Sequence, residues 1–310
     1  WVLPAMLIMS IAAISITLLE MKADVMHYFR YIAPVAVGFV GYSALTLSRK
    51  IVNEDYMLGF VVLAVIATLL FPSAYVFPIV LLVGGLFSSM IVRKEFEKEE
   101  VVFTIDWKKF LFPILILIIV GFLGMIINRN SAISLPLRLF GNFYRNGFLT
   151  FGGGQVLIPL MYAEFVEMKQ YLQAQEFLSA WALQQIVPGP VFSFTSFIGG
   201  MSMRSYGTWG QLLGSFIAVV GINMPGFILI IFAFPFWEKL KKLNSIKRAL
   251  PGINAVSVGF VIAAFLLMFQ TLEMSLETST IILLTIVCLQ YSKIPPIIII
   301  IAGIGAGLVI

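Results

Sequence analysis

The sequence predicts an all-α, polytopic membrane protein with about eleven transmembrane segments. Of its 310 residues, 60% are hydrophobic and 11% are charged, and the mean hydropathy is +1.03. Soluble domains carry roughly 25% charged and about 45–50% apolar residues. The apolar residues gather into long runs, two of which are interrupted by glycine or proline. A soluble core has too few polar groups to coat this much apolar surface, whereas a lipid bilayer accommodates it.

Continuous apolar runs provide most of the predicted spans. A spanning helix needs about 20 mostly apolar residues, because the hydrocarbon layer is ~30 Å thick. The continuous runs are Val2–Leu19, Ile32–Leu47, Met57–Phe71, Ala74–Val92, Phe110–Ile127, Gln211–Trp237, Ile253–Gln270, Ser279–Tyr291 and Ile294–Ile310. The segments between them are short, so we expect no separate domain outside the membrane.

Two further apolar stretches predict broken helices. Phe143–Val166 contains the glycine run Gly152–Gly154, and Phe177–Met203 contains Pro188–Pro190. A backbone break inside a membrane costs several kcal/mol per unpaired group unless protein, water or ligand satisfies it. A helix that restarts at Val191 would direct free N–H groups and the positive end of its dipole at the break. Such a break suits an oxyanion.

The polar and small residues around the two breaks form the predicted substrate site. Its candidate residues are Arg145, Asn146, Gly152, Gly153, Gly154, Gln155, Gln184, Gln185, Pro188, Gly189, Pro190 and Ser193. Arg145 would supply positive charge, and the glutamines would supply hydrogen bonds. The alternative is that glycine and proline here only shape helix packing, as small residues often do in membranes.

Charged residues within the predicted spans require a separate explanation. A charge at the bilayer centre costs at least ~2.5–3.5 kcal/mol, so a buried one is usually functional. Glu164 closes the same apolar stretch that holds the glycine run, and we consider it a candidate for proton coupling. The sequence leaves open the alternative that Arg138 and Glu164 are anchors at the membrane interface.

Self-comparison of the chain predicts two related repeats. At a shift of 221 residues, Pro4 aligns with Pro225, and the run 37–40 aligns with 258–261. Farther along, the shift becomes 218 residues. At that second shift, Pro78 aligns with Pro296. Proline is rare within helices, so two proline pairs at nearly one register argue against chance.

The self-comparison divides the chain into three parts. Residues 1–92 would be a first transporter repeat, 93–138 a linker with a connecting transmembrane helix, and 139–310 a complete second repeat. The front two helices of the first repeat would precede Trp1. We therefore expect residues 1–310 alone to insert into a membrane without conferring transport.

The distribution of basic residues predicts that the two repeats are inverted. Positively charged loops tend to face the cytoplasm. If the loops 93–109 and 238–252 are both cytoplasmic, 14 of the 20 Lys and Arg residues lie on that side and 6 on the other. Inverted repeats are common in secondary transporters, which bind substrate near the midplane between broken helices.

The series of short motifs along the second half resembles the chromate ion transporter family in its long-chain form. The resemblance covers about 170 residues and rests on several motifs in order. They are the runs 151–155, 176–178, 184–192, 199–200, 224–227 and 249–255. The resemblance implies a secondary transporter that exports chromate across the cytoplasmic membrane, with coupling to the proton gradient and with sulfate as a related substrate.

Other function classes are disfavoured by the composition. The chain has one histidine and one cysteine, Cys288, so an enzyme with a buried nucleophile and base is not expected. No metal site and no cofactor are predicted. The net charge of +5 comes from loop lysines, which gives no reason to expect a nucleic-acid partner. The open alternatives are a partial chain that does not transport, a transporter of a different anion, and assembly as a homodimer.

Overall fold

The computed structural model describes residues 2–20, 31–71, 76–92, 134–150, 157–240, 243–273, 275–292 and 294–309, with Leu115 and Ile119. Within these ranges the chain is helical, and they contain no strand. Three helices are long and apolar enough to cross a membrane, over Ile32–Ile51, Arg204–Ile230 and Asn244–Gln270. Six shorter apolar helices accompany them in the described ranges. The protein is thus an all-α, polytopic membrane protein, as the composition predicts.

The predicted continuous spans correspond to helices wherever the structure describes them. They are α1 (Val2–Glu20), α2 (Ile32–Ile51), α3 (Asp55–Leu70), α4 (Val76–Ile91), α10 (Gly207–Leu240), α11 (Asn244–Gln270), α12 (Leu276–Tyr291) and α13 (Pro296–Val309). The predicted connecting span Phe110–Ile127 lies outside the described residues, except for Leu115 and Ile119, which are helical.

The two interrupted stretches form short helical pieces. The first gives α6 (Ser134–Leu149), α7 (Leu157–Tyr162) and the π-helix η3 (Ala163–Met168). The second gives α8 (Ala174–Gln184), the 3₁₀ turn η4 (Val191–Ser193), α9 (Phe194–Ser202) and the 3₁₀ turn η5 (Arg204–Tyr206). The second break therefore lies where Pro188–Pro190 predicts it. The glycine run Gly152–Gly154 lies outside the described residues.

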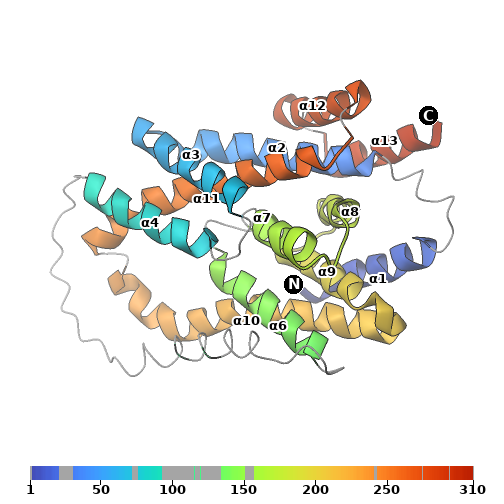
Figure 1. Cartoon of the computed structure of the whole chain (residues 1–310), viewed down its shortest axis with the longest axis horizontal. Helices are drawn as coiled ribbons and strands as arrows, with labels where there is room; N and C mark the ends of the chain where they lie inside the picture. Colours follow the sequence, from blue (N-terminus) through green and yellow to red (C-terminus); the bar gives the residue numbers. More distant parts are fainter. Residues whose placement is uncertain are drawn as a thin grey trace.

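The helices form two packed groups, with α1, α7 and α8 between them (Figure 1). In one group, α11 packs on α2, α3 and α4, and α12 packs on α2. In the other, α10 packs along α6 and α9. Between these groups, α1 covers α9, and α8 packs against α2. Helix α2 is buried along its first ten residues, because α11 and α12 cover it from its own group and α8 packs on it from the broken stretch.

Helix α11 begins earlier than the sequence predicts. The apolar run starts at Ile253, but the helix starts at Asn244 and contains Pro251. Proline removes a helical hydrogen bond and crowds the preceding turn. The hydroxyl of Ser88 on α4 repairs the opened turn, because it donates to the Arg248 carbonyl oxygen at 2.7 Å and accepts from the Gly252 N–H at 3.1 Å. This bridge lets the helix pass through the proline.

Two glycines make reciprocal contacts between the two predicted repeats. A Cβ on Gly38 would lie 2.6 Å from Cβ of Thr285 on α12, and one on Gly259 would lie 2.6 Å from Cβ of Ala64 on α3. Each glycine also faces a carbonyl oxygen, that of Ile282 for Gly38 and that of Val61 for Gly259. The members of each corresponding pair are 221 residues apart. This equals the shift from which the two repeats were inferred.

Candidate functional site

A buried carboxylate and three donor side chains form a cluster where α6 meets η3. Asn142, Arg145 and Asn146 lie three and four residues apart on α6, so they share one helix face. Glu164 belongs to η3, and π-helical turns are often found at functional sites. Glu164 is 0% exposed. The side chain of Arg145 is 18% exposed.

Each of the three donor side chains in this cluster donates a hydrogen bond to the Glu164 carboxylate. Arg145 donates from Nη2 to Oε1 and forms an ion pair with it. Asn146 donates from Nδ2 to Oε2 at 2.8 Å. The amide of Asn142, oriented with its nitrogen toward the carboxylate, donates to Oε1 at 3.1 Å. A buried carboxylate is stable only when it is paired and hydrogen-bonded, and here both conditions are met.

The Arg145 guanidinium retains a spare donor. Its Nε atom is buried and has no acceptor among the described residues. A buried donor without a partner costs about 1–3 kcal/mol. This N–H group is therefore available to an oxygen ligand that the protein itself does not supply.

The second break is braced by the side chains on either side of it. The Ser193 hydroxyl lies 2.6 Å from the Pro190 carbonyl oxygen and 3.1 Å from Oε1 of Gln184, and either oxygen can accept its proton. Gln184 also donates from Nε2 to the Pro190 carbonyl oxygen at 3.5 Å. Gly189 has a φ of 155°, which side chains rarely adopt, and its Cα faces Ala5 of α1. The break is thus a fixed turn with a defined shape.

Helices α8 and α9 form a hairpin around the break at Pro188–Pro190, and helix α1 closes one side of this hairpin. The hydroxyls of Ser10 and Ser196 are 2.8 Å apart, and Ser196 also donates to the Met6 carbonyl oxygen at 3.0 Å. A Cβ on Gly200 would lie 3.1 Å from that of Ala13. A helix of the predicted first repeat therefore packs directly on α9, which belongs to the predicted second repeat.

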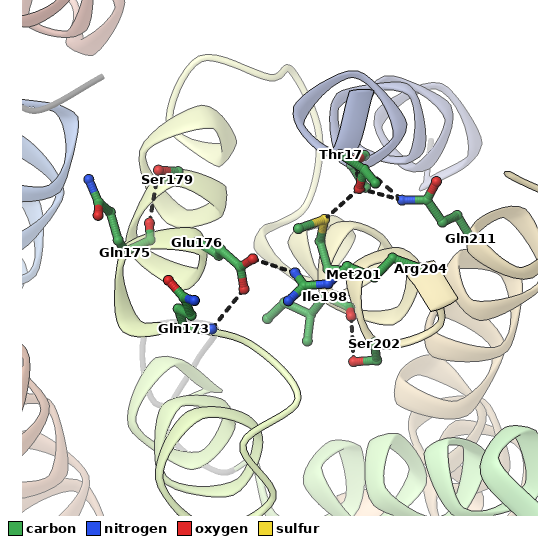
Figure 2. A network of polar contacts seen from close by, with 11 residues as sticks. Thr17, Gln173, Gln175, Glu176, Ser179, Ile198, Met201, Ser202, Arg204 and Gln211 are labelled. Atoms are coloured by element: carbon green, nitrogen blue, oxygen red, sulfur yellow. Dashed lines mark hydrogen bonds and ion pairs between the residues drawn. The ribbon is translucent and has the colours of Figure 1, made fainter. Parts of the chain in front are cut away.

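A second ion pair ties the outer ends of this hairpin together (Figure 2). Arg204 on η5 donates from Nη1 to Oε1 of Glu176 near the start of α8. The other oxygen of Glu176 accepts from the Gln173 backbone N–H at 2.7 Å, which caps α8. In the same view, Gln211 of α10 donates to the Thr17 hydroxyl of α1 at 2.8 Å.

The second ion pair was not predicted from the sequence. Glu176 was noted only as part of a family motif, and Arg204 only as a loop charge. Glu176 stands three residues after Gln173, and this spacing, typical of a capping box, is the one local signal that could have pointed to it. Nothing in the local sequence pairs it with Arg204, which lies 28 residues away.

The predicted site residues fall into two sets in the structure. Arg145 and Asn146 meet Glu164 in one cluster, and Gln184, Pro190 and Ser193 meet at the break. Pro188 and Gly189 are exposed, and Gln185 is half-buried. Gly152, Gly153, Gly154 and Gln155 lie outside the described residues.

An aromatic row connects the two sets. Tyr162, two residues before Glu164, packs edge-on against Phe177 of α8 with ring centroids 5.3 Å apart. Phe177 in turn packs edge-on against Phe194, the first residue of α9, at 5.8 Å. Buried rings in contact are close-packed, so a continuous row of packed side chains joins the two sets.

Comparison with known proteins identifies relatives along the whole chain. A family model described as chromate transporter matches residues 137–308. An uncharacterized transporter from Methanocaldococcus jannaschii is 23% identical, over 100% of this chain and 75% of its own length. A chromate transport protein from Cupriavidus metallidurans is 23% identical, over 86% of this chain and 62% of its own length. A probable chromate transport protein from Synechococcus elongatus is 24% identical, over 98% and 74%.

No solved structure matches the chain. The family model covers more than half of the residues, and it covers α6, η3, the break at Pro188–Pro190 and both ion pairs. The chain therefore belongs to the chromate transporter family, a family of membrane ion transporters.

Proposed function

We propose that this chain is a secondary active transporter that exports chromate, or a related oxyanion such as sulfate, across the cytoplasmic membrane. The relatives named as chromate transport proteins support the substrate class. The proposed scheme requires no cofactor, because the donors assigned to the anion are all protein groups.

The donor cluster around Glu164 is the observation that carries this proposal. A guanidinium and two carboxamides converge on one oxyanion, the buried Glu164 carboxylate. Arginine favours oxyanions because its planar fork matches two oxygens at once. The same groups are suited to the oxygens of chromate or sulfate.

The break at Pro188–Pro190 supports the proposal independently. The first N–H groups of a helix have no partner within it, and they carry the positive end of its dipole. Here η4 begins directly after Pro190, and the Ser193 N–H already donates to the Pro190 carbonyl oxygen at 3.0 Å, so the N–H groups before Ser193 are the candidates for the anion. We assign the break and the glycine run at 152–154 to the two halves of the path that the anion follows.

Transport into everted membrane vesicles tests the function. Export from cells becomes uptake in such vesicles, so vesicles that contain the full-length protein should accumulate chromate when energised. An excess of sulfate should reduce the uptake if sulfate shares the site. Vesicles that show no uptake above those from cells without the protein would refute the proposal.

Matched variants connect transport to the cluster. Arg145→Gln should abolish most of the uptake, because it removes the charge that holds the anion. Arg204→Gln breaks the other buried ion pair and controls for general damage, so it should retain more transport at equal protein level. Equal uptake by Arg145→Gln and the unaltered protein would show that Arg145 does not contact the anion.

A further inference from the structure

The Glu164 carboxylate occupies the position that an oxyanion substrate would take. Both of its oxygens are engaged, Oε1 by Arg145 and Asn142 and Oε2 by Asn146. The side chain is completely buried, so no water competes for these bonds. The site is therefore already filled by an oxyanion that is attached to the protein.

A substrate anion and an ionised Glu164 cannot share these donors. Two negative charges side by side in a buried site repel each other strongly, and like charges force one carboxyl group to take up a proton. A protonated carboxyl group is neutral and accepts hydrogen bonds weakly, so it releases Arg145. Protonation of Glu164 is thus the step that makes the donors available.

The charged neighbours of Glu164 leave Arg145 as its main partner. On α6, Arg138 is a second cation, and its backbone carbonyl oxygen faces Asn142. On η3 itself, Glu167 lies one turn away and is half-buried. Helix α11, which packs on α7, has no charged residue between Gly252 and Gln270, and α10, which packs on α6, has none between Gly207 and Trp237. The hydroxyls of Tyr144 and Tyr162 are the other titratable groups buried on α6 and α7.

We propose that Glu164 is a tethered substitute for the substrate, so that an oxyanion and a proton bind together and cross the membrane in the same direction. This rests on the proposed function and specifies its ion coupling. Coupling between two ligands is reciprocal: the anion favours proton uptake by Glu164, and the proton favours anion binding by Arg145.

This coupling defines the charge that moves during export. A divalent oxyanion accompanied by one proton carries a single negative charge. An inside-negative membrane potential drives negative charge outward. The membrane potential, rather than proton entry, would therefore drive export through this site.

Proton uptake during sulfate binding tests the coupling. Sulfate is a dianion throughout the neutral range, so any proton taken up belongs to the protein. Calorimetric titration of the purified chain with sulfate, in buffers of different ionisation enthalpy, should show uptake of up to one proton per sulfate bound. Apparent affinity should fall by up to about tenfold per pH unit where Glu164 is ionised. Release of protons, or binding with no proton, would overturn the coupling.

Glu164→Gln provides the decisive variant, because glutamine imitates the neutral carboxyl group. It should bind sulfate without proton uptake and with an affinity that does not change with pH. Glu176→Gln, at the other ion pair, should retain the proton uptake of the unaltered chain. Proton uptake that persists in Glu164→Gln would refute the assignment to this residue.

The failure of the coupling can be distinguished from failure of the function. Sulfate binding without a proton would remove the coupling and leave oxyanion transport standing. If neither the unaltered chain nor Glu164→Gln bound sulfate or chromate at any pH, the proposed function and the coupling would both be refuted.

Discussion

Arg145 on α6 and Glu164 on η3 form an ion pair inside the protein, 19 residues apart in the sequence. Breaking such a pair on one side leaves a buried charge without compensation, whereas removing both charges is often nearly neutral. Arg145→Gln should therefore lower the free energy of unfolding by about 3–5 kcal/mol. The double variant Arg145→Gln, Glu164→Gln should recover most of this loss. Thermal or denaturant unfolding in detergent measures both, and additive losses in the double variant would contradict the pairing.

Gly189 should be intolerant of a side chain. Its φ of 155° is strained for other residues, and an added Cβ would lie 2.6 Å from that of Ala5. Gly189→Ala should cost about 1–3 kcal/mol from the backbone strain, with the clash in addition. Gly226→Ala on α10 is the matched control, because a Cβ there meets nothing within 4 Å. Ala5→Gly should relieve the clash and leave the strain, so rescue should be partial; full rescue would show that the backbone is not strained.

A second substitution that removes the contacting side chain should restore the stability of a Gly38 variant but not that of a Gly259 variant. Gly38→Ala meets mainly the Thr285 side chain, at 2.6 Å, so Thr285→Gly should restore much of the lost stability. Gly259→Ala meets the Val61 carbonyl oxygen at 2.5 Å. Because a backbone atom cannot be removed, Ala64→Gly should not rescue it. Thermal unfolding of the two pairs of variants tests this, with Gly59→Ala as the control at an open position.

The predicted topology places the loops 93–109 and 238–252 on the cytoplasmic side. The second loop is shorter than predicted, because α11 begins at Asn244 and residues 244–252 are therefore helical. Single cysteines at Lys241 or in 93–109, introduced after Cys288→Ser, should resist a membrane-impermeant reagent added to intact cells. They should react once the membrane is opened. Labelling of either loop in intact cells would contradict the inverted arrangement.

Glycine at 153 is predicted to lie close to the anion. Gly153→Val would fill the space that a backbone-bound anion needs. An apolar side chain such as valine is compatible with a membrane protein, so insertion and folding should be little affected. We expect chromate uptake by everted vesicles to fall at least about tenfold, a loss of 1.4 kcal/mol in transition-state stabilisation, with protein abundance near normal. Unchanged uptake would exclude the glycine run from the path.

Much of the helical framework could be predicted from the sequence. The spans follow from hydropathy, which is summed over about 20 neighbouring residues and needs no tertiary information. The break at Pro188–Pro190 was equally predictable, because proline lacks the N–H group that a helix needs. The start of α11 was missed, because hydropathy marks only the apolar run from Ile253 and several residues before it are polar. The Ser88 bridge that carries the helix through Pro251 comes from another helix.

The sequence by itself determined most of the helical framework, the break at Pro188–Pro190, and that a few charged residues would have to be satisfied within an apolar protein. It identified Arg145 and Glu164 separately, as a candidate anion contact and a candidate proton acceptor. Only the tertiary structure brought them together, added Asn142 and Asn146 as donors to the same carboxylate, and paired Glu176 with Arg204. Hydropathy and backbone propensity act over one or two helical turns, so they leave a local record in the sequence. The partner of a buried charge depends on how separate helices pack, and no local pattern records that.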